Sequence, residues 1–491
     1  MSGGYQALGF TDNPFNSNTA EREPEIAAYA VHPPYLDRTE EASKKSGSFF
    51  LEGARGSGKS ATRLTIAKKL MSGPQDQLVV PFTSFNIFRP YIKGALTIDL
   101  FATQVAFLVA EGLLAWLSTL SEEDQRAFKA HTADSTPLIS NFISTFYLNR
   151  SDKSRADSAS ETYELIGTSI PTKVGIWIEK RWDAVSSSLV NVALAIAKKK
   201  ADFDLGNPES YQAMLARQKG DGFHDPIYIL KKAVEVARAF GFSGILIQMD
   251  KVDETDWTGN DLDAASDLIV PILSNINLHE IENLTWTFFV WDEVSRNIRR
   301  KNGAKIRFDK IPSGLIAWEV GYLADMVNRR MSYFSGGRIK ELSDISEPGT
   351  DVNSLMLEMI DLTGRSPRSL ISVFDHVLST HIQRNQRVPR KLDTDAFESG
   401  MNSFALQALY NKGLLEEART ISKLRSLEFV TKDVQRLTRQ SAQTSRGKID
   451  RWVELQLVKY DGTKQVATAG RPVDKFRVAD PLVARIVSRD L

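Results

Sequence analysis

The residues best suited to do chemistry form one short run, Gly53-Ala54-Arg55-Gly56-Ser57-Gly58-Lys59-Ser60. The run has the pattern G-x-x-x-x-G-K-S, which is that of a phosphate-binding loop, the Walker A motif. Its glycines let backbone N–H groups turn inward around phosphate oxygens, where a Cβ would clash. In such a loop Lys59 reaches the β- and γ-phosphates of a nucleotide, and the Ser60 hydroxyl ligates Mg²⁺. We therefore expect ATP and Mg²⁺ as cofactors, with nucleotide contacts from Gly53, Arg55, Gly56, Ser57, Gly58, Lys59, Ser60 and Ala61.

The segments on either side of the loop support this interpretation. Residues 48–51 are a short apolar run, which is typical of a buried parallel strand. After the loop, apolar residues recur at helical spacing up to Leu70, and Lys68 and Lys69 lie near the expected helix end. A helix that begins at the loop would also favour an anion through its N-terminal dipole.

A second motif places carboxylates at the end of another strand. Residues 244–250 form a mostly apolar strand that closes on Asp250, and Lys251-Val252-Asp253-Glu254 follow it. This is the Walker B pattern, in which Asp250 is a ligand of Mg²⁺. Either Glu254 or Asp253 is expected to orient and deprotonate the attacking water. The common form of the motif has the catalytic Glu directly after the Asp, where this chain has Lys251, so the choice between the two stays open.

A third strand, residues 284–291, closes on Asp292. A polar residue at the end of the strand beside Walker B can sense the γ-phosphate, and Asp292 is the candidate; an ordinary strand-end turn is the alternative. The segment directly after this strand is rich in basic residues. They could supply an arginine finger to a neighbouring subunit, although a solvated basic face is the preferred interpretation for all but one of Arg296, Arg299, Arg300 and Arg307.

Composition narrows the class of protein. The chain has 491 residues, 42% hydrophobic and 25% charged, and its net charge of +1 produces no global field that would attract nucleic acid or membrane. It has no cysteine, and its six histidines form no H-x-x-x-H pair, so neither a Cys nucleophile nor a zinc site is expected. The start has no signal-peptide pattern, and the apolar run 100–117 is expected to be a core helix rather than a membrane span. A cytoplasmic location and no membrane partner are the expectation.

The last eighty residues change character. Helices are expected at 415–427, 431–440 and 445–456, the third with Ile449, Trp452 and Val453 on one face, followed by two strands at 457–460 and 475–478. Three helices and a two-stranded hairpin describe a winged helix. Residues 431–471 contain nine Lys/Arg and four Asp/Glu, a local balance of 9 − 4 = +5. Double-stranded DNA is a candidate partner, and protein contact is the alternative. The residues expected at DNA are Arg446, Lys448, Arg451, Lys464 and Arg471.

The order of these parts resembles the origin-recognition-complex-like branch of AAA+ and STAND P-loop ATPases, including bacterial members from mobile-element and phage-defence genes. The resemblance rests on Asn13-Pro14-Phe15, the phosphate loop, residues 250–254, Gly364-x-x-Pro367-Arg368 and the C-terminal residues 476–482. It implies an ATPase core of parallel strands in the order 5-1-4-3-2 and a helical lid. In such lids the G-x-x-P-R arginine, here Arg368, touches the γ-phosphate as sensor 2.

The expected fold class is therefore α/β, a P-loop NTPase of the ASCE or AAA+ type with a parallel sheet core, a helical insertion, a helical lid and a C-terminal winged helix. The expected domains are an N-terminal lead-in at 1–47, a core at 48–333 with an insertion at about 115–220, a lid at 334–410 and the winged helix at 411–491. The expected function is an ATP-hydrolysing molecular switch, slow or partner-stimulated, that couples nucleotide state to DNA binding or effector recruitment. A nucleotide-bound scaffold in an oligomer with little turnover is the alternative. A P-loop kinase and a nuclease fit less well.

Overall fold

The computed structural model of the chain describes residues 2–17, 19–23, 26–71, 77–91, 96–117, 120–147, 225–259, 261–385, 391–465 and 472–491. They pack as two compact units, which are described separately because their relative positions are not determined. The sheet unit comprises Ala20–Ala27 and His32–Ala317, and the helical unit comprises Met1–Thr19, Ala28–Val31 and Trp318–Leu491. The polar composition of residues 151–165 predicts a loop, and the amphipathic spacing of residues 174–200 predicts a helix. Both segments and most of the expected insertion lie outside the described residues.

Five parallel strands form the centre of the sheet unit in the order β2-β3-β4-β1-β5. This is the order 5-1-4-3-2 expected from the resemblance, read from the other edge. Pro81 lies in edge strand β2, where its missing N–H costs no ladder hydrogen bond. The bounds of the strands are β1 (Gly47–Gly53), β2 (Leu78–Phe82), β3 (Ile245–Met249), β4 (Leu284–Trp291) and β5 (Ser313–Leu315).

Helices cover both faces of this sheet, so its strands are apolar on both sides. Leu78, Val80 and Phe82 belong to the larger core together with helices α5 (Ile98–Leu117) and α12 (Pro226–Ala239). Val79 and Leu246 point to the opposite face and join the core that includes α3 (Pro34–Ser43) and α4 (Lys59–Leu70). The remaining elements described in this unit are η1 (Ala20–Arg22), η2 (Asn86–Tyr91), α6 (Glu122–His131), η3 (Ala133–Ser135), α7 (Thr136–Phe146), α13 (Leu262–Leu273), α14 (Ile276–His279) and α15 (Asp292–Asn302).

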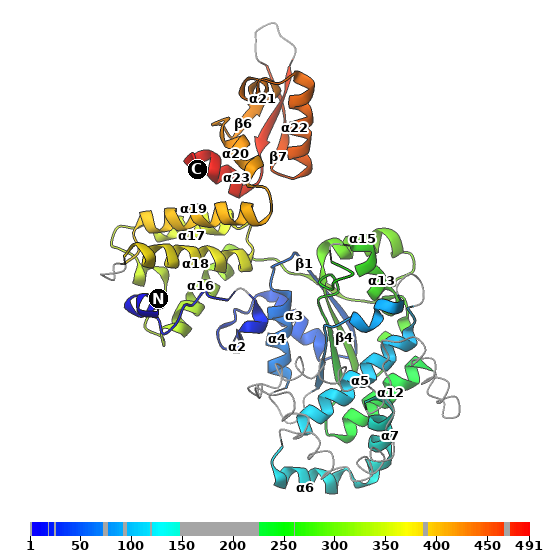
Figure 1. Cartoon of the computed structure of the whole chain (residues 1–491). Coiled ribbons are helices and arrows are strands. Elements are labelled where there is room, and N and C mark those ends of the chain that lie inside the picture. The colour runs from blue at the N-terminus through cyan, green and yellow to red at the C-terminus, as the bar shows by residue number, and fades with distance from the viewer. Residues whose placement is uncertain are drawn as a thin grey trace. The chain divides into compact units, whose positions relative to one another are not determined.

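Helix α5 is the one described helix that is long and apolar enough to cross a membrane by length and composition. In the structure, 94% of its most apolar window is buried. It packs against α12, α7 and β2 within the sheet unit (Figure 1). The expectation of a core helix over residues 100–117 is confirmed.

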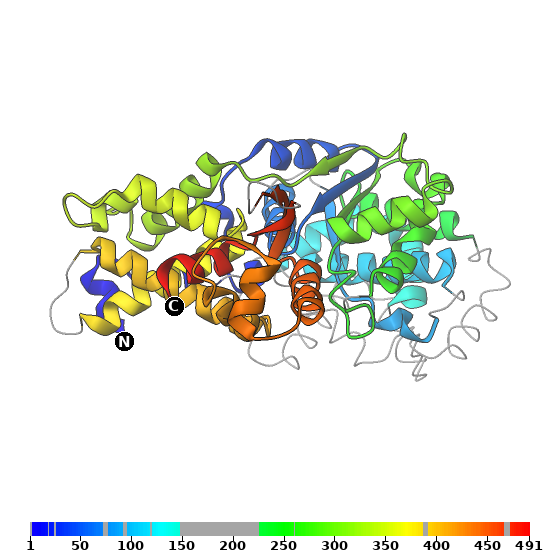
Figure 2. The ribbon, with the colours of Figure 1, turned by 90° about the horizontal axis from the view of Figure 1, so that it is seen from above.

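The helical unit contains α1 (Ser2–Ala7), α16 (Val320–Phe334), η4 (Leu342–Ile345), α17 (Val352–Leu362), α18 (Pro367–Arg384) and α19 (Thr394–Asn411), while the short helix α2 (Ile26–Tyr29) spans the boundary between the two units. Helices α18 and α19 lie side by side (Figures 1 and 2). Pro367 begins α18 as expected, since a proline in the first turn loses no hydrogen bond. Helix α16 belongs to this unit, so the compact boundary falls after residue 317, whereas the sequence placed it after 333.

The first residues also pack within the helical unit and do not form a continuous lead-in with residues 32–47. Phe15 is buried and stacks on Phe374 with 4.9 Å between ring centroids. Arg330 of α16 is 3% exposed and donates hydrogen bonds to the carbonyls of Pro14 and Ser17. This is a correction to the expected lead-in, and its cause is the burial of Phe10 and Phe15 in the core of the helical unit.

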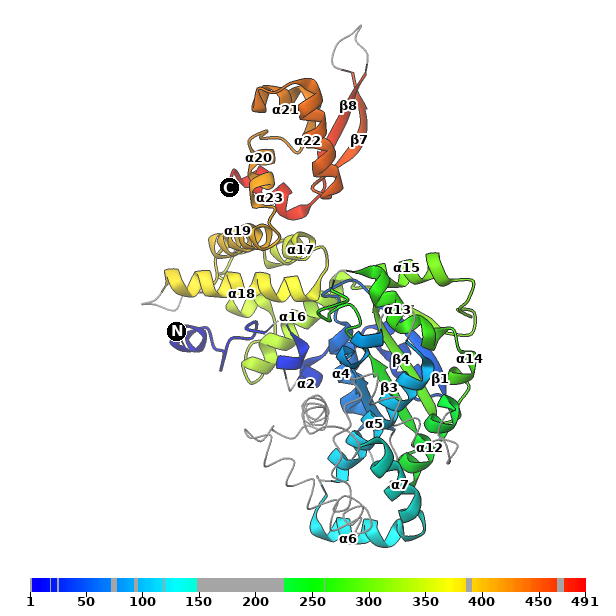
Figure 3. The ribbon, with the colours of Figure 1, turned by 45° about the vertical axis from the view of Figure 1, so that its right-hand side comes forward.

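The C-terminal part has the order helix, strand, two helices, two strands and helix. Its elements are α20 (Leu415–Ser422), β6 (Glu428–Val430), α21 (Thr431–Thr438), α22 (Ala442–Glu454), β7 (Val458–Lys464), β8 (Val473–Val478) and α23 (Pro481–Arg489). Strands β7 and β8 form an antiparallel hairpin beside α22 (Figure 3), and β6 pairs with β8 as a third strand.

One expectation about this part is wrong, and a second is refined by the burial of the residues. The helix expected at 415–427 ends at Ser422, because the chain turns at Arg425, with φ 53°, and pairs as β6 instead. Ile449, Trp452 and Val453 have the i, i+3, i+4 spacing of one helix face, as expected. Ile449 and Trp452 are fully buried, whereas Val453 lies at the edge of this face and is 39% exposed.

Candidate phosphate-binding site

The loop after β1 has the backbone that a phosphate cradle requires. Gly56 and Gly58 have φ values of 77° and 96°, a region that side chains with a Cβ rarely adopt. A Cβ added at Gly53 would lie 2.5 Å from Ser57 Oγ and 3.1 Å from the Ile316 Cβ, so the loop and the residue after β5 leave no room for a side chain. Gly58 is the N-cap of α4 and leaves the helix N-terminus directed at the loop. Backbone N–H groups and a helix dipole together favour an anion here.

Lys59 is the first residue of α4, and its side chain folds over the loop. Nζ donates to the carbonyl oxygens of Gly53 and Ala54 at 2.9 and 3.1 Å. Burial lowers the pKa of Lys59 below its ordinary value, and four carboxylates oppose that shift, namely Asp250, Asp253, Glu254 and Asp292. The expected site residues at the ends of two strands, β3 and β4, therefore act electrostatically on one ammonium group. A polyphosphate can replace the carbonyl contacts with charge-assisted ones.

Ser60 and Asp250 meet as the two motifs predict. Ser60 Oγ donates to Asp250 Oδ2 at 2.9 Å, and the Lys251 backbone N–H donates to Oδ1 of the same carboxylate at 2.9 Å. Asp250 is 1% exposed. One hydroxyl beside one carboxylate is the donor set of a Mg²⁺ that keeps several waters and also binds phosphate oxygens. The residues present thus fit both the nucleotide and the metal ion.

Arg63 is a member of this site that the sequence reasoning missed. Its Nε donates to Asp250 Oδ2 at 3.2 Å, and Arg63 and Asp250 are both buried. The backbone carbonyl of Arg63 accepts a hydrogen bond from Gln248 in β3. The available signal was its spacing, because a residue three after Ser60 lies on the same face of the helix. The charge of Asp250 is therefore balanced inside the protein before any cation binds.

The two candidate bases after β3 have different surroundings. Asp253 is 5% exposed and accepts a hydrogen bond from Arg55 Nε at 3.1 Å. Glu254 is exposed. Lys251, directly after Asp250, has a φ of 64°, so the backbone turns sharply there through a strained conformation. This turn moves the carboxylates that follow out of line with β3, and only Glu254 of the two remains accessible to water.

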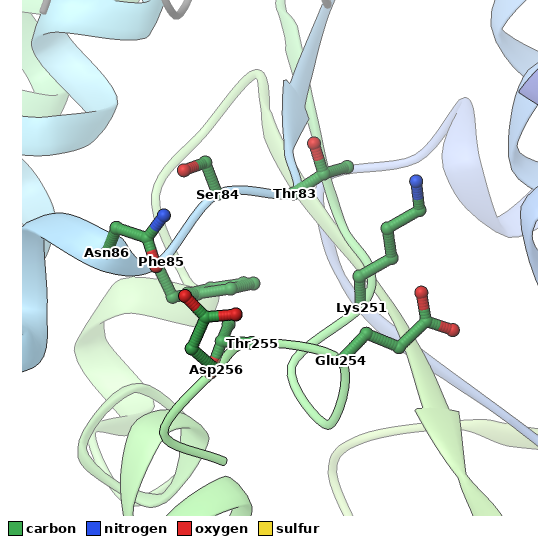
Figure 4. Close-up of a pocket in the computed structure, with 8 residues that line it drawn as sticks. All are labelled: Thr83, Ser84, Phe85, Asn86, Lys251, Glu254, Thr255 and Asp256. Atoms are coloured by element: carbon green, nitrogen blue, oxygen red, sulfur yellow. The ribbon is translucent and has the colours of Figure 1, made fainter. Parts of the chain in front are cut away.

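Glu254 also lines a pocket of about 320 Å³ between the segments that follow β2 and β3. Figure 4 shows the side chains of Lys251 and Glu254 extending to the same side, with those of Ser84, Asn86 and Asp256 on the other side. The remaining lining residues are Thr83, Phe85 and Thr255. The pocket is open and rich in hydroxyl, amide and charged groups, so water can reach the Glu254 carboxylate.

Asp292 begins α15 directly after β4, and its carboxylate accepts a hydrogen bond from Arg296 at 2.9 Å. The other arginines expected after this strand also have partners within the sheet unit. Arg300 donates to Asn297 and Arg307 pairs with Asp309, both nearby in the chain, whereas Arg299 pairs with Glu52 of β1 at 2.7 Å. Such pairing at partly exposed side chains is typical of a solvated basic face.

The remaining predicted site residues lie in the helical unit, which is not placed relative to the loop. Arg368 is the second residue of α18, as expected. On α22, Arg446 pairs with Asp474 at 2.9 Å, Arg451 pairs with Glu417 at 3.3 Å, and Lys448 lies over the Trp452 ring. Lys464 is the last residue of β7, and Arg471 lies outside the described residues.

The sheet order and the loop geometry define the class of the chain as an α/β P-loop NTPase fold. No protein-family model matches the chain, and no curated protein sequence matches it. Among solved structures, the chain is similar to the ADP form of the Aeropyrum pernix ORC2 protein, with 12% identity and a TM-score of 0.37 over 98% of this chain and 99% of that chain. It is also similar to the ADPNP-ADP complexes of that protein, with 12% identity and a TM-score of 0.33 over 97% of each chain. Similarities of this size carry no functional assignment, which therefore depends on the residues of the site.

Proposed function

We propose that the chain is an ATP-binding and ATP-hydrolysing molecular switch. The observation that carries this proposal is the Ser60–Asp250 hydrogen bond, which joins the phosphate loop to the strand beside it at 2.9 Å. Lys59 lies among four carboxylates at the same point. A P-loop hydroxyl paired with a strand-end carboxylate serves to hold the Mg²⁺ of a bound nucleoside triphosphate. The charge of the Mg²⁺ helps to neutralise the phosphates.

Each residue has a distinct part in this proposal. The loop amides and Lys59 bind the phosphates, while Ser60 and Asp250 hold Mg²⁺. Glu254 orients the attacking water and accepts its proton, because it is exposed to water whereas Asp253 is buried. Asp292 and Arg368 remain the candidates for sensing the γ-phosphate. The nucleotide would move the switch by the difference in its affinity for the two states.

The output of the switch is proposed to be DNA binding or recruitment of an effector protein. The order of helices and strands from α20 to β8 is that of a winged helix, with α22 as the third helix and β7–β8 as the wing. Exposed Arg446 and Arg451 on α22 and Lys464 at the end of β7 suit a phosphate backbone. Assembly into a homo-oligomer, a cytoplasmic location and a setting in phage defence or mobile elements are the remaining parts of the proposal.

A nucleotide-bound scaffold with little turnover is the second candidate. Lys251 favours it, since it occupies the position after Asp250 where the water-activating carboxylate commonly stands. Its backbone turns sharply, with φ 64°, and the next carboxylates, Asp253 and Glu254, come only after this turn. In this alternative the same site binds ATP but positions water poorly.

Glu254→Gln is expected to lower ATP turnover at least about 100-fold, because a positioned general base typically contributes that much. The affinity for ATP should stay unchanged, since Glu254 is not among the proposed phosphate or metal contacts. Turnover is measured by phosphate release at saturating ATP, with and without duplex DNA. Asp256→Asn is the matched control, because Asp256 is an exposed carboxylate that lines the same pocket two residues further on.

The outcomes separate the two candidates. Stimulation by DNA together with loss of turnover in Glu254→Gln supports a DNA-coupled switch. Negligible turnover in the wild type, with and without DNA, while ATP still binds would contradict the switch and favour the scaffold. Unchanged turnover in Glu254→Gln would reassign the base to Asp253.

A further inference from the structure

Arg55, the third residue of the phosphate loop, is held by two groups from other strand ends. Its Nε donates to Asp253 Oδ2 at 3.1 Å, and its Nη2 donates to the Asp253 backbone carbonyl at 3.3 Å. Its guanidinium also lies over the Trp291 ring, 4.0 Å from the centroid. These contacts link the loop after β1 to the ends of β3 and β4.

The fold of the loop does not require an arginine at this position. The turn depends on Gly56 and Gly58, which have positive φ, whereas Arg55 does not. The Arg55 side chain is 41% exposed and the Asp253 side chain 5% exposed, so a half-solvated cation is placed on a buried carboxylate. Water solvates the guanidinium side of this pair, so the pair contributes less to stability than one with both partners buried. The role of the arginine therefore depends on the groups that its guanidinium faces.

Asp253 is shared by both cations of the loop. It attracts Lys59 as well as pairing with Arg55. A phosphate chain bound by the loop would compete with Asp253 for both side chains. The planar guanidinium fork binds phosphate oxygens in a bidentate manner, and the Trp291 ring fixes its plane.

The position of Arg55 points to the terminal phosphate in particular. Its partner Asp253 directly precedes Glu254, the proposed base. The water activated by Glu254 must attack the terminal phosphorus, so the phosphate nearest this segment is the terminal one. ADP lacks that group and would leave the Arg55–Asp253 pair intact.

We propose that Arg55 discriminates ATP from ADP by exchanging Asp253 for the terminal phosphate. This inference rests on the proposed nucleotide-binding function. In the nucleotide-free and ADP states Arg55 stays on Asp253 and Trp291. In the ATP state the guanidinium binds the terminal phosphate, and the loop that carries Asp253 and Glu254 is released from it.

The test measures dissociation constants of the full chain for ADP and for a non-hydrolysable ATP analogue by calorimetry, with Mg²⁺. Arg55→Ala is expected to weaken the ATP analogue about 10- to 100-fold, as the loss of a charge-assisted contact implies, and to change ADP affinity less than about threefold. Arg55→Lys should retain part of the preference. Arg238→Ala, an exposed arginine of α12 in the same unit, should change neither constant.

Asp253→Asn is expected to change the preference for the ATP analogue over ADP in the direction opposite to Arg55→Ala. Because it removes the competitor for Arg55, it is expected to raise the affinity for the ATP analogue relative to ADP. Equal losses for both nucleotides in Arg55→Ala, or a loss of ATP preference in Asp253→Asn, would overturn the inference and assign the pair a structural role. Failure of the wild type to bind either nucleotide would instead overturn the proposed function as well.

Discussion

Lys59→Ala is expected to abolish measurable binding of both ATP and ADP, with affinity falling at least about 100-fold. Lys59 lies at the N-terminus of α4 and donates to two carbonyls of its own loop. Those contacts hold the ammonium over the place where phosphates are proposed to bind. Truncation removes a desolvated cation that four carboxylates surround, so the site becomes net repulsive to a polyphosphate.

The measurement is a titration with fluorescent ATP and ADP in the presence of Mg²⁺. Lys68→Ala is the matched control, since Lys68 lies in the last turn of the same helix and faces away from the loop end. The control should bind both nucleotides as the wild type does. Retention of wild-type affinity by Lys59→Ala would contradict the assignment of the loop.

Asp250→Asn is expected to destabilise the sheet unit by about 3 kcal/mol, because it breaks a buried ion pair by neutralising one partner. Asp250 accepts hydrogen bonds from Arg63 and Ser60, and both it and Arg63 are buried. The neutral amide leaves the Arg63 guanidinium without its counter-charge. The same change removes the proposed Mg²⁺ ligand, so the effect of Mg²⁺ on ATP binding should also disappear.

Hydrogen exchange of peptides from α4 and β3 measures this loss within the sheet unit, apart from the helical unit. Asp253→Asn is the control, because its partner Arg55 is 41% exposed in its side chain and water can solvate it after the change. The control should lower the opening free energy by less than about 1 kcal/mol. Equal effects of the two substitutions would show that the Arg63–Asp250 pair is not buried as described.

Much of the fold followed from short-range patterns in the sequence. The apolar runs at 284–291, 48–51 and 244–250 predicted β4 at the position observed and β1 and β3 to within a few residues. The apolar residues at 78–82 likewise predict a strand, observed as β2, and the helical spacing at 226–240 predicts a helix, observed as α12. The spacing of the glycines predicted the phosphate-binding loop, because the conformation of this loop depends on residues that are adjacent in the sequence. The order of the strands came from the resemblance, and the structure confirms it.

The missed features depend on pairing between distant segments. Strands β5 and β6 have three residues each and carry no periodicity of their own, so only their partners β1 and β8 define them. The pairs Arg63–Asp250 and Arg55–Asp253 join residues nearly 200 positions apart. The sequence shows that carboxylates follow β3. It does not show which arginine pairs with each of them, because that depends on how the strands are arranged in the sheet.

Binding of ATP with Mg²⁺ by the wild-type chain underlies the proposed switch, the scaffold alternative and the role of Arg55. The measurement is an equilibrium titration of the full chain with ATP, in Mg²⁺ and again in EDTA. We expect saturable binding of one ATP per chain, with clearly higher affinity in Mg²⁺, because Ser60 and Asp250 form the proposed metal-binding pair. The absence of saturable binding at millimolar ATP, or equal affinity in Mg²⁺ and EDTA, would contradict the proposed site.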